Sequence, residues 1–421
     1  MGQFVSGAWA LLLGLLLLMV GNGMQGTLLG VRGEIEGFST AEMSFVMSAY
    51  FVGFLGGSRL TPEMIRRVGH VRVFAALGSF ISAVLVLFPT ITEPWVWVIA
   101  RIVIGFGFSG VYVTAESWLN NAATNENRGK ALSLYMIVQM VGLVAAQGIL
   151  VLGDPSGFVL FIIPSILVSI SFAPILLSVS PTPAFESSSS VSLKELFNTS
   201  PLGFVGVFLL GGMFAAQFGM SAVFGTMIDL TINQISMFVA SFYVGATLIQ
   251  YPIGWISDRM DRRLLILIVG GVSVFGGALG LAYGTRFEML LLSALILGGT
   301  VNPLYSLLVA YTNDFVSSDE MAGTSGGMLF VNGLGAIAGP IVMGWLMTAY
   351  GASAYFMFQC FLMTVLCVYA AYRMTIRPAP NVEETGTYTP VSLASTPVAW
   401  EVAQEHDQQV AADAIEPENE R

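Results

Sequence analysis

Arg101 and Glu116 are the residues of this sequence whose types and spacing most directly suggest chemistry. They lie in one apolar segment, residues 95–119, and belong to a set separated by 4, 7 and 4 positions: Arg101, Gly105, Tyr112 and Glu116. On an α-helix this spacing places the set within a stripe about 60° wide. The two charges are 15 residues apart, about 22 Å along the axis, so they cannot pair with each other. Because a charge inside a membrane needs protein or cavity water around it, the stripe predicts a site that binds or moves charge.

Glu116 also has a purely structural interpretation. It is followed by Ser117 and Trp118, and tryptophan is common where a helix reaches the membrane surface. Glu116 is therefore either a coupling carboxylate or an interfacial residue. Arg101 lies deeper in the segment, where a charged side chain usually marks a pathway or a functional pair, so we interpret it as a substrate or coupling residue.

Three amides stand in otherwise apolar segments. Asn22 and Gln25 lie in residues 7–30, and Gln217 has a comparable place in residues 201–226. An amide in hydrocarbon needs a partner, so these side chains either join neighbouring helices or line a central cavity. Both interpretations remain open from the sequence.

Composition and hydropathy define the segments that must position these residues. Of 421 residues, 55% are hydrophobic and 10% are charged, whereas about 25% are charged in ordinary soluble proteins. Apolar runs of about 20 residues cross a membrane as helices. The sequence contains twelve such runs: 7–30, 43–62, 71–90, 95–119, 130–152, 157–178, 201–226, 235–256, 263–283, 288–312, 322–349 and 352–374. The predicted fold is an all-α membrane protein with twelve transmembrane helices.

A polar, arginine-rich loop, residues 254–263, has a weaker copy earlier in the chain. Moving the sequence by 192 positions places residues 241–262 on residues 49–70. A second match, at 194 positions, places residues 299–323 on residues 105–129. Two matches in the same order and at nearly the same offset indicate two homologous halves in parallel orientation. The predicted architecture is two pseudo-symmetric six-helix bundles.

The loop residues are candidates for a gate that closes one side of the protein. A carboxylate at a helix junction can bind the positive N-terminus of a facing helix, and we expect Asp258 to face the helix that begins near residues 127–129. The equivalent position in the first copy is Arg66, where only Glu63 nearby could substitute, so gating should depend more on the second copy. The candidate gate residues are Arg66, Arg67, Gly69, Arg128, Gly254, Asp258, Arg259, Arg262 and Arg263.

Basic residues set the expected orientation in the membrane. Those near helix ends fall mostly in alternate connectors, while the other connectors contain only Arg32 and Arg286. The side richer in arginine and lysine is normally cytoplasmic. We therefore expect both termini and the gate loops on the cytoplasmic side of a plasma membrane, the inner membrane in a bacterium. The segment that follows residues 1–6 lacks a basic flank and a cleavage site, so we interpret it as an uncleaved first helix.

Several stretches resemble the major facilitator superfamily. Residues 101–107 are similar to its fourth-helix signature, and residues 254–264 are similar to its cytoplasmic loop motif, with Asp261 where the family prefers glycine. Within the superfamily the sequence resembles the YcaD-like branch most, through Glu116-Ser117, residues 127–131, Tyr135-Met136, Leu304-Tyr305 and residues 335–340. The resemblance covers residues 7–375. It implies a two-bundle transporter with a central substrate site and alternating access.

The sequence departs from the family pattern in two places. Arg66 replaces the loop aspartate in the first half. The Gly-Pro pair typical of antiporters is expected in the fifth helix, where residues 145–147 read Ala-Ala-Gln; Gly339-Pro340 occurs in the eleventh helix instead. The displaced Gly-Pro pair weighs against a drug/proton antiporter. Four residues are expected to act in helix packing or as hinges: Gly105, Gly335, Gly339 and Pro340.

Catalytic and cofactor chemistry finds no support in the sequence. Cys360 and Cys367 lie seven residues apart, about 10 Å along a helix, which is too far for a disulfide. The histidines are His70 and His406, and no metal-ligand spacing, catalytic constellation or phosphate-binding loop occurs. We predict no catalytic residue, metal, cofactor or nucleic-acid partner.

The predicted domains are residues 1–178 for the first bundle, 179–200 for a linker, 201–376 for the second bundle and 377–421 for a tail. The linker is rich in proline and serine, with a short surface helix expected near residues 191–197. The tail has nine acidic residues and one basic residue after Arg377, which gives −8 of the net charge of −10. Its few apolar residues cannot form a core, so we predict a disordered cytoplasmic tail.

These observations predict a monomeric secondary active transporter of a small molecule, with protons as the candidate coupling ion and the lipid bilayer as its surroundings. The alternative is a transporter-like receptor that keeps the fold without turnover, which the weaker first loop would permit. An enzyme is the least favoured class, because no acid, base and nucleophile can be grouped among the intramembrane residues.

Overall fold

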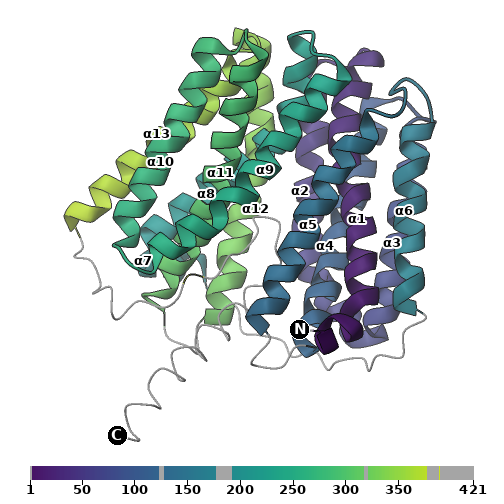
Figure 1. The fold of residues 1–421 in the computed structure, drawn as a ribbon, viewed down its shortest axis with the longest axis horizontal. Helices are drawn as coiled ribbons and strands as arrows, with labels where there is room; N and C mark the ends of the chain where they lie inside the picture. The colour runs from purple at the N-terminus through teal and green to yellow at the C-terminus, as the bar shows by residue number, and fades with distance from the viewer. Residues whose placement is uncertain (1, 123–127, 177–191, 317–320, 377–387, 389–421) are drawn as a thin grey trace, which may run out of the picture.

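The computed structural model describes residues 2–122, 128–176, 192–316, 321–376 and Tyr388. Within these ranges it contains thirteen helices and no strand (Figure 1). The helices are α1 (Gly2–Ile35), α2 (Thr40–Val68), α3 (His70–Leu87), α4 (Pro94–Ala122), α5 (Arg128–Leu150), α6 (Val159–Leu176), α7 (Leu193–Thr199), α8 (Pro201–Met227), α9 (Ile232–Ser257), α10 (Arg262–Tyr283), α11 (Phe287–Asn313), α12 (Met321–Tyr350) and α13 (Ala354–Ile376).

Each of the twelve predicted runs corresponds to one long helix, so the predicted fold class is confirmed. Ten of these twelve helices are both long and apolar enough to cross a membrane; the other two are α2 and α6, and the apolar part of α6, Val159–Pro174, is shorter. The surface helix expected in the linker is α7, which Ser192 caps by accepting a hydrogen bond from the backbone of Glu195. The rest of the linker and, except for Tyr388, the tail lie outside the described residues.

The helix caps repeat between the halves at the offset that the sequence suggested. Ser39 and Glu42 form a capping box at the start of α2, and Thr231 and Gln234 form one at the start of α9, 192 positions later. At the other end of α2, the backbone turns at Gly69 with φ +86°, a conformation that favours glycine. The equivalent residue, Asp261, caps α10 through its side chain.

Close packing inside each half repeats in the same way. A Cβ atom on Gly53 of α2 would lie 1.9 Å from the carbonyl oxygen of Ile102 in α4. Its counterpart Gly245 in α9 would place a Cβ atom 2.0 Å from the carbonyl oxygen of Leu295 in α11. Gly105 meets the carbonyl oxygen of Tyr50 at a similar distance. The two crossings therefore depend on glycine, because any side chain would separate the backbones.

The predicted packing glycines of the second half lie on one face of α12. A Cβ atom would lie 2.0 Å from the carbonyl oxygen of Phe208 if added to Gly335, and 2.2 Å from that of Gly212 if added to Gly339. Both contacts join α12 to α8. Pro340 follows in the interior of α12.

The two ends of the bundle can be named by their loops. The gate-loop face carries residues 66–69 and 258–261, and α1 begins and α13 ends there (Figure 1). The far face carries the connections of residues 36–39, 151–158 and 228–231.

The halves meet mainly toward the far face. The hydroxyl of Ser48 in α2 donates to the carbonyl oxygen of Ile337 in α12 at 2.5 Å. An apolar cluster joins α1 and α5 to α8 and α9 through Val31, Ala222, Ile235, Val239 and Tyr243, with Met140 and Leu143 packed against it. Beyond this cluster, α9 and α5 diverge as they run toward the gate-loop face (Figure 1). The halves therefore close the far side of the space between them.

Candidate functional site

A central cavity of about 120 Å³ lies between the two halves. It is lined by α1, α2, α4 and α5 from the first half and by α8, α9, α11 and α12 from the second. This volume holds several water molecules. The lining residues include four of the six substrate or coupling candidates from the sequence: Asn22, Gln25, Arg101 and Tyr112.

These four residues form one hydrogen-bonded chain. The amide nitrogen of Asn22 donates to the hydroxyl of Tyr112 at 2.7 Å, and the amide nitrogen of Gln25 donates to the side-chain oxygen of Asn22 at 3.0 Å. Arg101 in turn donates from its Nη1 atom to the side-chain oxygen of Gln25. The chain fixes which way each amide points, because each oxygen accepts and each nitrogen donates.

Arg101 is held by neutral groups. Its side chain is 4% exposed. Its Nε atom donates to the carbonyl oxygen of Val46 at 3.4 Å, and its guanidinium lies 4.8 Å from the ring centroid of Tyr50. No carboxylate of the described residues pairs with it. The site thus contains a permanent positive charge without a negative partner in the part of the chain that the structure describes.

The second half contributes an apolar, aromatic wall. Phe218 stacks on Tyr243 with ring centroids 4.8 Å apart, and Phe214 packs against Phe218 at 4.6 Å. Two amides interrupt this wall, Asn302 in α11 and Asn332 in α12. The side-chain oxygen of Asn302 is buried and has no hydrogen-bond partner among the described residues. Both halves therefore contribute aromatic rings and amides to the cavity, and the charged side chain, Arg101, belongs to the first half.

Glu116 lies outside the cavity lining. It is 2% exposed, and its Oε1 atom accepts a hydrogen bond from the hydroxyl of Tyr135 in α5 at 2.7 Å. Arg101 and Glu116 both lie on α4, as the predicted stripe requires, but the two side chains contact different parts of the structure. Arg101 reaches the cavity, and Glu116 joins α4 to α5 nearer the gate-loop face.

Gln217 also lies outside the cavity lining, unlike its counterpart Gln25. It is fully buried in α8, and both its amide atoms have no hydrogen-bond partner among the described residues. Neighbouring Ser221 contacts the hydroxyl of Tyr355 in α13 at 2.6 Å. Gln217 therefore points into the second bundle in this structure. An offset of 192 could not show this, because a small rotation of α8 decides which face of the helix meets the cavity.

The first gate loop is a local cluster. Arg66 and Arg67 form ion pairs of 2.7 and 2.6 Å with Glu63, one turn earlier in α2. The side chains of both arginines are largely exposed. The sequence suggested that Glu63 could substitute for the missing loop aspartate. In the structure Glu63 pairs with arginines of its own helix, α2. The side chain of Arg128 lies outside the described residues.

The second gate loop contains a buried ion pair. Arg262 donates to the carboxylate of Asp314 at the end of α11 at 2.5 Å, with side-chain exposures of 3% and 4%. Arg263 pairs with Asp261 at 2.9 Å. Burial alone would raise the pKa of Asp261, but hydrogen bonds from the side chain and backbone of Arg263 lower it. The Arg262–Asp314 pair joins α10 to the end of α11 at the gate-loop face, and the Arg263–Asp261 pair stays within the start of α10.

Asp258 has a partner that the sequence did not suggest. Its Oδ1 atom accepts a hydrogen bond from the backbone nitrogen of Tyr388, a tail residue, at 2.7 Å. The Tyr388 ring covers Gly254, where a Cβ atom would lie 2.6 Å from it. Arg259, in the turn after α9, instead folds back over the end of α9, and its guanidinium lies 4.2 Å from the ring centroid of Trp255. Residue 127, in the segment expected to face Asp258, lies outside the described residues.

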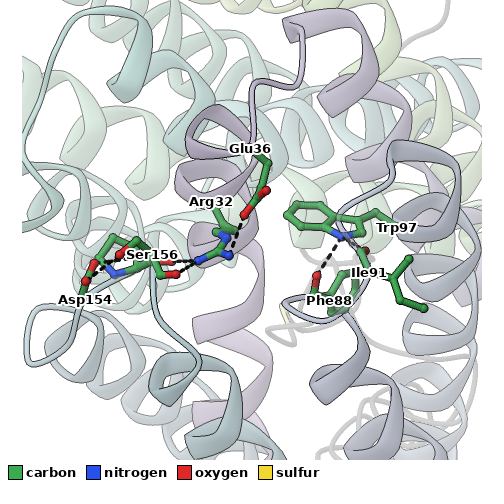
Figure 2. A network of polar contacts seen from close by, with 8 residues as sticks. Arg32, Glu36, Phe88, Ile91, Trp97, Asp154 and Ser156 are labelled. Carbon is green, nitrogen blue, oxygen red and sulfur yellow. Dashed lines mark hydrogen bonds and ion pairs between the residues drawn. The ribbon is translucent and has the colours of Figure 1, made fainter.

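The far face has its own polar network, which the sequence analysis used only for orientation. Arg32 at the end of α1 pairs with Glu36 at 2.6 Å and donates to the carbonyl oxygens of Pro155 and Ser156 (Figure 2). Hydrogen bonds from the side chain and backbone of Ser156 hold the pKa of Asp154 below its usual value. The network fixes α1 to the connection between α5 and α6.

Trp97 anchors the neighbouring connection. Its indole nitrogen donates to the carbonyl oxygens of Phe88 and Ile91 at 3.1 and 3.0 Å (Figure 2). These bonds fix the turn between α3 and α4, so α4 enters the bundle from an ordered end. In the first half, hydrogen bonds and an ion pair therefore fix the connections at the far face to the adjacent helices.

Comparison with known proteins identifies the family. The sequence profile of the Major Facilitator Superfamily matches residues 11–231 and 213–404. The chain belongs to the major facilitator superfamily. The profile matches each half of this superfamily protein, in agreement with the repeated caps and glycines.

Curated relatives and solved structures agree with this assignment. The chain is 26% identical over 350 residues to the uncharacterized MFS-type transporter YcaD of Escherichia fergusonii, a match that covers 82% of this chain and 90% of the relative. YcaD of Salmonella arizonae is 25% identical over 351 residues, with the same coverage. The resemblance to the YcaD-like branch is confirmed.

Two solved structures share the fold. The nucleoside transporter NupG superposes with a TM-score of 0.71 at 15% identity, covering 87% of this chain and 98% of NupG. A bacterial homolog of the human lysosomal transporter Spinster, inward-facing and unoccupied, superposes with a TM-score of 0.65 at 14% identity, covering 95% and 97% of the two chains. At these identities the similarity establishes the shared fold alone.

Several lining residues were not singled out from the sequence. Tyr50, Gln139, Asn302 and Asn332 all line the cavity. The three amides carry the same signal as Asn22 and Gln25, a polar group in an apolar segment, and applying that rule to every helix would have found them. Tyr50 and Tyr388 gave no such signal, because tyrosine is common at membrane interfaces and in loops.

Proposed function

We propose that this chain is a secondary active transporter that moves a small molecule through the central cavity by alternating access. The observation that carries the proposal is the cavity between the two halves, closed toward the far face by contacts that cross from one half to the other. The Ser48–Ile337 hydrogen bond and the apolar cluster around Tyr243 supply that closure. Membership in a transporter superfamily supports the same function.

Separate parts of the molecule would perform the steps of the cycle. The hydrogen-bonded side chains of Asn22, Gln25, Arg101 and Tyr112 would bind the substrate. Glu116 would carry the coupling proton, since it is a buried carboxylate between α4 and α5. The gate loop around Asp258 would bring the halves together at the gate-loop face. From the distribution of arginine we assign that face to the cytoplasmic side of a plasma membrane. The proposed cycle contains no catalytic step.

Flux into proteoliposomes tests the function. Purified protein is reconstituted and exposed to labelled small molecules selected by thermal stabilisation of the protein. The expected result is uptake that saturates with concentration and is absent from empty liposomes. Ligands that bind tightly but never cross the membrane would instead identify a receptor with the transporter fold.

A matched variant makes this test specific to the cavity. Replacing the exposed Phe361 of α13 with Ala changes a side chain remote from the cavity lining and should leave uptake unchanged. Replacing the lining residue Tyr112 with Phe removes the hydroxyl that accepts from Asn22 and should reduce uptake. Equal uptake by both variants would show that the substrate takes another route.

A further inference from the structure

The charge of the central cavity indicates which substrates fit it. Arg101 is the one charged side chain among the described lining residues. Its guanidinium stays protonated in proteins, and its partners Gln25, Val46 and Tyr50 are neutral. A buried charge without a counterion is costly, because the surrounding protein replaces only part of the lost hydration. A ligand that supplies a negative charge would remove that cost.

The guanidinium also has hydrogen-bonding capacity left. Its Nε and Nη1 atoms donate to oxygen, whereas the one acceptor of Nη2 among the described residues is the sulfur of Met47 at 3.8 Å. Sulfur is a weak acceptor, so this nitrogen can donate to a better one. A carboxylate is the natural acceptor, because its two oxygens match the spacing of guanidinium donors.

A second cation lies on the way to the gate-loop face. Arg59 follows the lining residue Leu55 by one turn of α2, and its guanidinium lies 4.1 Å from the ring centroid of Phe330 in α12. It is exposed, unlike Arg101. Arg59 thus adds a second positive charge between the cavity and the gate-loop face, and positive charge there attracts anions.

The aromatic wall of the second half fits an apolar, flat molecule. The stacked rings of Phe218 and Tyr243 and the adjacent ring of Phe214 form an aromatic surface in the second half, whereas Arg101 belongs to the first half. A ligand with an anionic group and an aromatic or similarly flat body would place each part against matching chemistry.

We propose that the cavity binds small organic carboxylates with a flat apolar body, and that Arg101 binds the carboxylate. This inference rests on the proposed function, since it takes the cavity as the substrate site. A cationic substrate would need a carboxylate in the lining, and Glu116 instead lies outside it, bonded to Tyr135. A neutral substrate could accept a hydrogen bond from Arg101 but would leave its positive charge without a counterion.

Thermal unfolding of the purified protein in lipid nanodiscs tests the proposal. The probes are matched triples of a carboxylate, its amide and its ammonium analogue, such as benzoate, benzamide and benzylammonium. The carboxylates should stabilise the protein at concentrations at least about tenfold lower than the other two, a difference equivalent to about 1.4 kcal/mol. Equal or stronger stabilisation by amides or ammonium compounds, or none by any carboxylate, would overturn it.

Two variants assign the preference to Arg101. Arg101→Gln should abolish the difference between carboxylate and amide, and Arg101→Lys should retain an anion preference, because the charge remains. If Arg101→Gln fails to fold, the lysine variant and Tyr112→Phe still test the site. An anion preference that survives unchanged in Arg101→Gln contradicts the assignment.

The flux assay separates this proposal from the proposed function. A carboxylate that binds through Arg101 but never crosses the membrane rejects transport and keeps the anion site. An amide that is transported as well as its carboxylate rejects the anion site and keeps transport.

The contact of Tyr388 carries a second, independent inference. The tyrosine hydroxyl accepts a hydrogen bond from the amide nitrogen of Gln250 in α9 at 2.9 Å, and its backbone nitrogen donates to Asp258 at 2.7 Å. Its ring occupies space that Gly254 leaves by having no side chain. Three different groups of one tail residue are thus recognised by the second gate loop and the end of α9.

We infer that this surface, formed by Gln250, Gly254 and Asp258, is a docking site for the chain's own tail through Tyr388. When the tail is docked, Tyr388 binds the carboxylate of Asp258, which would otherwise be available to close the gate at the gate-loop face. Docking should therefore favour the arrangement seen here, with the halves in contact toward the far face, and release of Tyr388 should favour approach of the halves at the gate-loop face.

Distance measurements between spin labels test this inference. The labels replace Val68 and Leu264, exposed residues at the gate-loop ends of the two halves. Tyr388→Ala and Gly254→Ala, whose methyl group would collide with the ring, should both shift the distance distribution toward shorter values. Tyr372→Ala, which alters an exposed tyrosine of α13, is the control and should shift nothing. Distributions for both test variants identical to that of the parent protein would overturn the docking site.

Discussion

The guanidinium of Arg101 donates a hydrogen bond to the side-chain oxygen of Gln25, and this bond joins α4 to α1 beside the cavity. Each residue was a candidate from the sequence, but only the structure brings them together, across 76 positions of the chain. The bond fixes the orientation of the Gln25 amide, which in turn is hydrogen-bonded to Asn22, and Asn22 to Tyr112. The charge of Arg101 is in this way supported from one side and open to the cavity on the other.

Gln25→Glu should neutralise the site. A carboxylate in this place becomes a counterion for Arg101, so the melting temperature should rise while binding of carboxylates is lost. Gln25→Leu removes the acceptor and leaves a buried donor unsatisfied, which should destabilise the protein by about 1–3 kcal/mol. Thermal unfolding with and without benzoate measures both effects. A glutamate variant that still binds carboxylates would show that the charge of Arg101 does not select the substrate.

Glu116→Gln should uncouple transport from a pH gradient. A coupling carboxylate must bind and release a proton in each cycle, which glutamine cannot do. Gradient-driven accumulation of substrate should be abolished, while exchange of substrate at equilibrium continues. Tyr135→Phe is the matched control, because it removes the hydroxyl bonded to Glu116 and retains the carboxylate, so accumulation should persist. Continued accumulation by Glu116→Gln would make this residue structural.

Asp258→Asn should impair transport without reducing expression. The substitution removes the charge that Asp258 presents at the second gate loop, while the asparagine keeps an acceptor for Tyr388. Arg66→Asp in the first loop should have a milder effect, because Arg66 is exposed and already paired within its own helix. Initial uptake rates, corrected for the amount of protein in the membrane, compare the two. Equal tolerance of both changes would argue against a gate centred on Asp258.

Asp314→Ala should lower stability strongly. It leaves the buried guanidinium of Arg262 without its carboxylate partner, and breaking a buried ion pair from one side costs about 3–5 kcal/mol. Arg67→Ala breaks an exposed pair with Glu63 and should change stability little, since exposed pairs contribute little. Thermal unfolding in one detergent compares them. Similar melting temperatures for both variants would mean that the Arg262–Asp314 pair is not structural.

The sequence predicted the fold more completely than the site. Twelve apolar runs and an offset of 192 were sufficient for the helices and the two halves, because hydrophobic length and repetition are local signals. The same offset even relates the capping boxes at Ser39 and Thr231. These features depend on residues close together in the chain.

The site depended on helix rotation and on the conformational state, which local signals do not contain. Gln25 and Gln217 occupy equivalent positions, yet only Gln25 lines the cavity. Glu116 shares a stripe with Arg101 but contacts α5, because α4 meets different neighbours along its length. Asp258 binds Tyr388 of a tail predicted to be disordered, since a single docked residue leaves no compositional signal.

Access to Gly26 from each side of the membrane tests alternating access most directly. This residue lines the cavity, and a Cβ atom placed there would meet nothing within 4 Å, so a cysteine should fit. Gly26→Cys is made after replacing Cys360 and Cys367 with alanine, and is treated with a membrane-impermeant thiol reagent from either side. Alternating access predicts reaction from both sides, in proportions that a transported substrate changes. Reaction from one side alone, unaffected by substrate, would contradict it.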